Sequence, residues 1–218
     1  FSFITGRGPL ELRQFGDLAA SDMDRDGNID IYASSLENFG IGIWFGNGVY
    51  GWQSDTPPES SNSWQSLEAE ADLNFDGTTD IIVGSYGDVG ESGGGIKVWT
   101  SKDLAVPTWA GWIYNFVING KFNKIDTGDF NRDGAVDLVL TNDDESTEGL
   151  WVLTGDNNGD FEKVENLVTT KTGYYSVITA DFNRDGISDI AAGSKTAGFD
   201  VFFTNNDMTW SLSTSSVN

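Results

Sequence analysis

Short apolar stretches recur four times along the chain, and their pattern predicts strands. In the first, Ile41, Ile43 and Phe45 alternate with other residues on one face, while Trp44 lies on the opposite face. Alternation with a period of two is typical of a β-strand, and apolar residues on both faces indicate a strand covered on both sides. Matching stretches follow Gly95, Gly149 and Gly198. We therefore expect a buried strand at the same place in each of four repeats.

Three further strands are expected in every repeat. A continuous aliphatic run, such as Ile81–Val83, is typical of a buried strand. A stretch of small residues, such as Leu18–Ser21, precedes each run and suits a crowded inner strand. A less regular outer strand, such as Trp52–Ser54, completes the repeat. Four strands in each of four repeats predict an all-β protein.

A polar motif, D-x-[DN]-x-D-G-x-x-D, separates the small-residue strand from the aliphatic run in every repeat. It places oxygen-bearing side chains at positions 1, 3, 5 and 9, and a glycine at position 6 that permits a sharp turn. A hard cation with six to eight oxygen ligands fits such a loop, and Ca²⁺ is the usual one. The motif therefore predicts up to four calcium sites. The candidate side-chain ligands are Asp22, Asp24, Asp26, Asp30, Asp72, Asn74, Asp76, Asp80, Asp129, Asn131, Asp133, Asp137, Asp181, Asn183, Asp185 and Asp189.

Two other interpretations of these loops were weighed. An EF-hand needs a glutamate at position 12, where this chain has Ala33, Val83, Leu140 and Ala192, so that class is excluded. Solvated acidic turns would explain one copy, since Asp and Gly favour turns on their own. Four copies in register favour metal binding instead.

On this motif and the strands around it, the chain resembles the FG-GAP/VCBS repeat family. In that family the calcium loops lie between strands of β-propeller blades, as in integrin α-subunit heads. The Phe-Gly and Gly-Ala-Pro signatures of the family are absent or degraded in this chain. The resemblance implies that the backbone carbonyl of position 7 is a further ligand. The residues at that position are Asn28, Thr78, Ala135 and Ile187.

The spacing of the motifs predicts a four-bladed β-propeller. Successive motifs start 50, 57 and 52 residues apart, and the segments outside the first and last starts together make one more period, of 59 residues. We therefore expect one domain whose four blades close into a ring, with residues 1–8 as a closing or edge segment. Propellers of this family commonly have seven blades, so an open arc that pairs with another chain is the alternative. The expected blades span residues 9–55, 62–117, 121–166 and 171–216.

Position 4 of the motif is also repeated. Arg25, Arg132 and Arg184 occupy it in three loops and are expected to point away from the ion and to moderate the local negative charge. Phe75 replaces arginine in the second loop. The second loop is therefore expected to lack this neutralisation.

Charge and composition exclude several classes of function. A formal net charge of −22 argues against binding to a nucleic-acid backbone or an anionic membrane surface. The chain has no Cys and no His, which excludes disulfides, His-ligated zinc and every nucleophile system that needs a histidine base. Four divalent cations would add eight positive charges, so we expect metal removal to destabilise the fold.

These observations lead to a functional hypothesis. We expect a secreted, extracellular or cell-surface protein, because calcium loops of this kind suit extracellular calcium and the chain starts without Met, as a processed protein would. A fragment of a longer protein is the alternative explanation of this start. A non-enzymatic structural or adhesive role is expected, with self-assembly into an oligomer or filament. Two tryptophans within Leu104–Trp112 are expected to form an exposed contact patch.

Two alternatives remain open at this stage. A lectin-type propeller would stack sugars on tryptophan, but the tryptophans outside the strand pattern are not evenly repeated. A polysaccharide lyase or glycosidase would need a catalytic pair or base, and most of the acids already have a place in the metal loops. The partner could also be another extracellular protein or a glycan.

Overall fold

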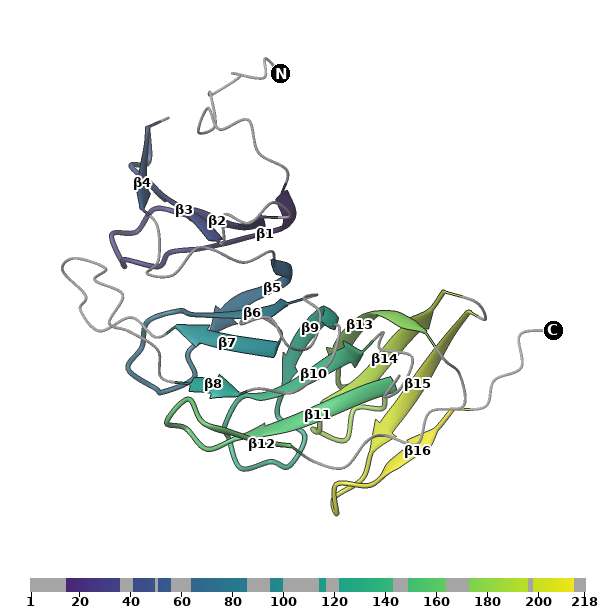
Figure 1. Ribbon diagram of the computed structural model, residues 1–218. Coiled ribbons are helices and arrows are strands. Elements are labelled where there is room, and N and C mark those ends of the chain that lie inside the picture. The colour runs from purple at the N-terminus through teal and green to yellow at the C-terminus, as the bar shows by residue number, and fades with distance from the viewer. Residues whose placement is uncertain are drawn as a thin grey trace, which may run out of the picture.

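The computed structural model describes residues 15–35, 41–49, 51–55, 64–85, 95–99, 114–116, 122–142, 149–163, 173–195 and 198–213. Within these ranges the protein is all-β, and every strand belongs to one of four antiparallel sheets of four strands (Figure 1). Segments 1–8 and 104–112, for which a closing role and a contact patch were expected, lie outside the described residues.

Each sheet is a simple meander, because consecutive strands pair with one another. The first sheet comprises β1 (Phe15–Ser21), β2 (Asp30–Ser35), β3 (Ile41–Gly46) and β4 (Trp52–Asp55). The second comprises β5 (Trp64–Ala71), β6 (Asp80–Ser85), β7 (Gly95–Trp99) and β8 (Tyr114–Phe116). The third comprises β9 (Phe122–Gly128), β10 (Asp137–Asn142), β11 (Gly149–Gly155) and β12 (Phe161–Lys163). The fourth comprises β13 (Tyr174–Ala180), β14 (Asp189–Ser194), β15 (Gly198–Thr204) and β16 (Trp210–Leu212).

The predicted order of strands within a repeat is confirmed. The polar motif connects the first strand of each sheet to the second, and the aliphatic run forms the second strand, as in β10. The first strands pack in sequence, β1 beside β5, β5 beside β9 and β9 beside β13. The small residues predicted for an inner strand therefore lie where the sheets converge.

The core is divided among the junctions between consecutive sheets. One cluster joins the first and second sheets through Tyr32 and Ile81, and a second joins the second and third sheets through Ile82 and Leu140. A third cluster joins the third and fourth sheets. Each of the two middle sheets is consequently covered on both faces, which explains the double-sided apolar pattern of their strands.

The closed ring that the spacing of the motifs predicted is not seen among the described residues. Figure 1 shows them as an arc, with β1–β4 at one end and β13–β16 at the other. The spacing of repeats along a chain counts sheets but does not determine the angle between them. That angle depends on the side chains packed at each junction, which the period does not encode.

Candidate metal centres

Hydrogen bonds within each motif fold it into a compact loop. In the first loop, the Gly27 amide donates to Asp22 Oδ2 at 3.0 Å and the Asp26 amide donates to Asp24 Oδ1 at 3.1 Å. The Asn28 amide donates to Asp26 Oδ1 at 2.7 Å. The bond between positions 6 and 1 recurs in the other loops at 2.7, 3.2 and 2.9 Å. The sequence pattern therefore specifies one loop conformation four times.

Two left-handed residues produce the turn. The glycine at position 6 has a φ between 82° and 87° in all four loops, a region that glycine enters without steric strain. Position 4 is also left-handed, although it holds Arg25, Phe75, Arg132 and Arg184, with φ between 54° and 65°. A non-glycine residue in this region is uncommon and carries strain, so the loop conformation is imposed by its other contacts.

The aspartate at position 9 anchors the loop to the sheet. Asp137 is fully buried, and its two oxygens accept hydrogen bonds from the Phe130 amide at 2.8 Å and the Gly155 amide at 2.9 Å. The pKa of Asp137 is raised to about 6, chiefly by burial and also by the negative charges of Asp133 and Asp129, although the two amide bonds lower it. A cation in the loop would favour the charged form of this carboxylate.

The same anchor is present in the first and fourth loops, and in the second loop the Asp80 carboxylate accepts a hydrogen bond from the Leu73 amide at 2.8 Å. The pKa of Asp30 is raised chiefly by burial, and its carboxylate accepts bonds from the Met23 and Gly46 amides, both at 2.8 Å. In the fourth loop, Asp189 accepts from Phe182 at 3.0 Å and from Thr204 at 2.9 Å. The anchor therefore links position 2 of the motif to the end of the third strand.

The position-1 carboxylates provide the clearest test of whether a cation fits. One oxygen of each is held by the glycine amide at position 6. The other oxygen, Oδ1 of Asp22, Asp72 and Asp129, is buried and accepts no hydrogen bond among the described residues. A buried carboxylate oxygen without a donor is costly unless a cation or water faces it. Three of the four loops thus have an oxygen available for a metal ion.

The first loop gathers the most carboxylates. One carboxylate oxygen from each of Asp22, Asp24 and Asp30 lies within 4.8 Å of the others. In the other loops position 3 is an asparagine, whose Nδ2 donates to the position-5 aspartate, at 2.7 Å in the case of Asn131 and Asp133. Because oxygen ligands suit hard cations, the donors in all four loops fit Ca²⁺ better than a soft metal.

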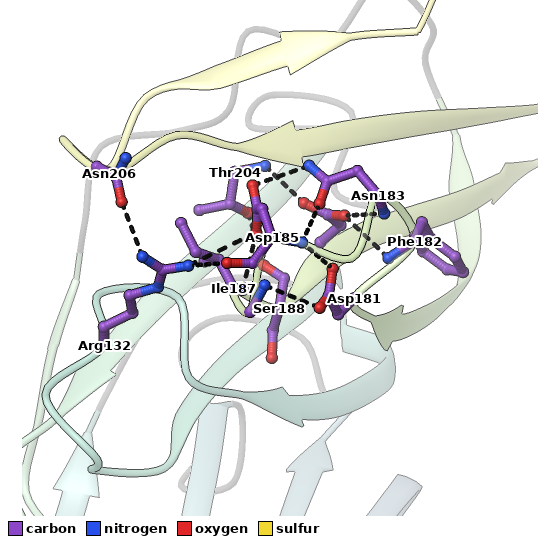
Figure 2. Close-up of polar contacts among 11 residues, drawn as sticks. Arg132, Asp181, Phe182, Asn183, Asp185, Ile187, Ser188, Thr204 and Asn206 are labelled. Atoms are coloured by element: carbon purple, nitrogen blue, oxygen red, sulfur yellow. Dashed lines mark hydrogen bonds and ion pairs between the residues drawn. The ribbon is translucent and has the colours of Figure 1, made fainter.

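The fourth loop differs from the others at position 1. Asp181 is exposed, and its Oδ1 accepts from the Asp185 amide at 3.0 Å while its Oδ2 accepts from Gly186 at 2.9 Å. Figure 2 shows Asp181, Asn183 and Asp185 converging around this loop. Its carboxylate would have to exchange a hydrogen bond to bind an ion, so the four sites are not equivalent.

The residues at position 7 join the loops through their amides. Those of Asn28, Thr78, Ala135 and Ile187 donate to the position-5 aspartate at 2.7–2.9 Å. Their carbonyls remain predicted ligands.

The pKa of Asp76 in the second loop is lowered. Burial raises this pKa, but hydrogen bonds from Thr78 and Asn74 and the positive charge of Arg25 together lower it by more.

Two of the position-4 arginines, Arg25 and Arg132, contact the next loop along the chain, which the sequence pattern does not predict. Arg132 donates to the backbone carbonyl of Asp185 and, at 3.1 Å, to Asn206 Oδ1, and its guanidinium lies 3.9 Å from Asp185 Oδ1 (Figure 2). The guanidinium of Arg25 lies against Gly77 in the second loop. We name each such contact, from position 4 of one loop to the following loop, an arginine bridge.

This arrangement corrects the expectation for Phe75. The second loop was expected to lack a neutralising arginine because Phe75 occupies its own position 4. The structure instead brings Arg25 to the second loop, and it is the third loop that Phe75 leaves without an arginine bridge. The left-handed backbone at position 4 directs the side chain toward the neighbouring sheet. This conformation could not be predicted from the sequence, because the residue at position 4 is not glycine.

Comparison with known proteins agrees with the repeat pattern. Residues 129–192, which include the third and fourth loops, match the family model of the FG-GAP-like repeat. The chain contains an FG-GAP-like repeat. The predicted resemblance is therefore confirmed, and the matched residues run from the third loop through β10, β11, β12 and β13 to the fourth loop and the start of β14. No curated protein matches the chain as a relative.

No helix among the described residues is long and apolar enough to cross a membrane.

Proposed function

We propose that this protein is a calcium-stabilised extracellular module of β-propeller type, in which each four-stranded sheet is a blade. The observation that supports it is the buried, unpaired position-1 oxygen in three loops of identical hydrogen bonding. The ion would be held by side-chain oxygens at positions 1, 3, 5 and 9 and the carbonyl at position 7. When bound, Ca²⁺ would supply charge neutralisation, and the loop's own residues fix the ends of two strands.

The proposed role is structural or adhesive and not catalytic. FG-GAP-like repeats suggest an adhesive propeller module, and they suit an extracellular location where calcium is abundant. The chain has neither His nor Cys. Among the described residues, the acids found close together in a group of three are Asp22, Asp24 and Asp30 of the first loop. An adhesive protein needs a rigid binding surface, and here the loops hold the strands of that surface in place. Calcium bound in the loops would therefore support adhesion.

Calcium-dependent adhesion tests this proposal. Beads coated with the protein should attach to an extracellular-matrix surface in millimolar Ca²⁺ and detach in EDTA, while thermal melting reports the fold in both conditions. Attachment that is equal with and without calcium would contradict the role of the metal. Selective binding to one glycan in an array would favour the lectin, and cleavage of a polysaccharide would contradict a non-catalytic role.

A further inference from the structure

The three junctions between consecutive sheets use the same positions of the repeat. Position 2 of the motif packs against the next sheet and is buried: Met23, Leu73 and Phe130 are 1–3% exposed. The first apolar residue of the third strand is covered in the same way. Ile41, Ile96 and Leu150 are 0–3% exposed.

At the β13–β16 end of the arc, the residues at the same positions are exposed in the part of the chain that the structure describes. Phe182, at position 2 of the fourth motif, is 43% exposed, and Phe199, the first apolar residue of β15, is 65% exposed. Ile178 on β13 is 58% exposed. Arg184, at the position of the arginine bridge, is exposed, and no loop of a following sheet lies beyond it among the described residues. We call Ile178, Phe182, Arg184 and Phe199 the donor face.

At the β1–β4 end, the positions that receive a neighbour are exposed as well. Leu18 is 65% exposed, whereas its counterparts four residues before the motif in the third and fourth repeats, Ile125 and Val177, are 0% and 2% exposed. Ile29, at position 8 of the first motif, is 58% exposed, and Ala20 on β1 is exposed too. We call Leu18, Ala20 and Ile29 the acceptor face; the covered part of this side of the sheet includes Trp44, which packs edge-on against Phe15.

The two faces are complementary in chemistry. At the β9–β13 junction, the Thr179 amide donates to Asp126 Oδ2 at 2.6 Å. The equivalent positions at the two ends are Ile178 and Ala20, both apolar. Arg184 would meet the first loop, the only one whose motif carries four aspartates. The contact between two molecules would thus combine an apolar contact between Ile178 and Ala20 with an ionic contact between Arg184 and the first loop. Two of the internal junctions likewise combine apolar packing with an arginine bridge.

We propose that the donor face of one molecule binds the acceptor face of a second copy of this chain, continuing the arc of sheets from β13 to the partner's first strand. Figure 1 places the first sheet, β1–β4, and the last sheet, β13–β16, which carry the two faces, at opposite ends of the arc. A head-to-tail contact of this kind closes into a ring or continues as a filament. The inference rests on the proposed function in that the first loop must be folded to receive Arg184.

Cysteine cross-linking tests the contact directly, because the natural chain has no cysteine. Two single variants, Ile178→Cys and Ala20→Cys, are mixed in calcium and oxidised. A disulfide-linked pair containing one of each is expected, at several times the yield of either homodimer. The double variant Asp126→Cys/Thr179→Cys is the control, since this pair lies at an internal junction and should form a bond within one chain.

The opposite outcomes are equally clear. If the double variant Ile178→Cys/Ala20→Cys forms its bond only within one chain, the sheets close on themselves and the second copy is wrong. If the control pair is oxidised but no mixed pair forms, and the unmodified protein sediments as a monomer, the interface is also wrong.

A second set of variants checks the face without cysteine. Phe182→Asp should weaken association by at least tenfold in sedimentation, and Arg184→Glu should weaken it less. Phe75→Asp changes another phenylalanine, 58% exposed, away from both end faces, and should leave association unchanged. Melting curves in calcium and EDTA accompany each variant: a calcium-independent melting temperature rejects the proposed function, whereas calcium-dependent melting of a monomer rejects only this interface.

Discussion

At the scale of single residues, the position-1 aspartate has two separate tasks. Asp129 uses Oδ2 to accept the Gly134 amide at 3.2 Å, which closes the loop, and leaves Oδ1 buried without a donor. The loop can therefore form before an ion is bound, but it retains an unfavourable buried oxygen. Binding of a cation relieves this penalty and lowers the repulsion among neighbouring carboxylates.

Replacement of Asp129 by alanine should remove one calcium ion from the protein. The variant loses the free oxygen and the loop-closing acceptor together, so we expect one ion fewer per chain and a lower melting temperature in calcium. Calcium content measured after dialysis checks the first effect. Asp156→Ala is the matched control, because Asp156 lies in an exposed turn between β11 and β12 and should leave the calcium content unchanged.

Asp137 should give the calcium-free protein a distinct pH dependence. Its pKa is about 6 in the folded state and about 4 in an unfolded chain, so the folded state retains a proton that the unfolded state releases between these values. Stability should therefore fall as pH rises from 4 to 6, by up to about 3 kcal/mol from this group, and calcium affinity should rise over the same window.

Denaturant unfolding in EDTA at several pH values measures this effect. Asp137→Asn cannot titrate, so its stability should fall less steeply than that of the unmodified protein over this range. Parallel curves for the two proteins would mean that Asp137 titrates at an ordinary value in the folded state.

At the scale of elements, the first and third loops are each attached to the third strand of their sheet by a close backbone approach. A Cβ added to Gly155 would lie 2.3 Å from the carbonyl oxygen of Val136, and one added to Gly46 would lie 2.4 Å from that of Ile29. At these two strand ends only glycine can approach the carbonyl so closely while it donates its amide to the buried position-9 aspartate. In the fourth sheet, Thr204 keeps the amide bond and adds a hydroxyl bond to Ser188 O at 2.7 Å.

Gly155→Ala should therefore destabilise the protein by about 1–3 kcal/mol, because backbone atoms must move to accommodate the methyl group. Chemical denaturation measures the change. Gly193→Ala serves as the comparison, since the nearest atom to its added Cβ is the flexible Ser176 Oγ at 2.7 Å, which can rotate away. Similar losses for the two variants would contradict the importance of the close approach.

The missing arginine bridge can be supplied. Phe75→Arg should place a guanidinium against the third loop, as Arg25 does for the second and Arg132 for the fourth. Because the contact is exposed, the gain in unfolding free energy should be at most about 1 kcal/mol and should vanish in 1 M salt. Phe75→Gln separates the loss of phenylalanine from the added charge, and an equal effect of the two variants would exclude a bridge.

At the scale of the whole molecule, most of the local structure could be predicted from the sequence. The period-two pattern located β3 and β11, the aliphatic runs located the second strands, and the D-x-[DN]-x-D-G-x-x-D motif located the loops between them. These features follow from local periodicity and turn chemistry, and the sequence of each repeat is enough to predict them.

The relationships between sheets could not be predicted in the same way. The arc in place of a ring depends on packing angles, and the direction of the arginine bridges depends on a left-handed residue that is not glycine. The exposure of Phe182 and Phe199, against the burial of their counterparts in other repeats, became visible only when the junctions could be compared. Sequence repeats suggest equivalence, whereas the structure shows which ends lack a neighbour.

The measurement that tests the account most directly is the number of calcium ions bound per folded chain, by native mass spectrometry, together with the melting temperature before and after chelation. We predict up to four ions, with the fourth loop the last to fill, and a melting temperature that falls sharply in EDTA and recovers when calcium is restored. A folded protein that binds no calcium, or whose melting temperature is unchanged by EDTA, would contradict the proposal that these loops are metal centres.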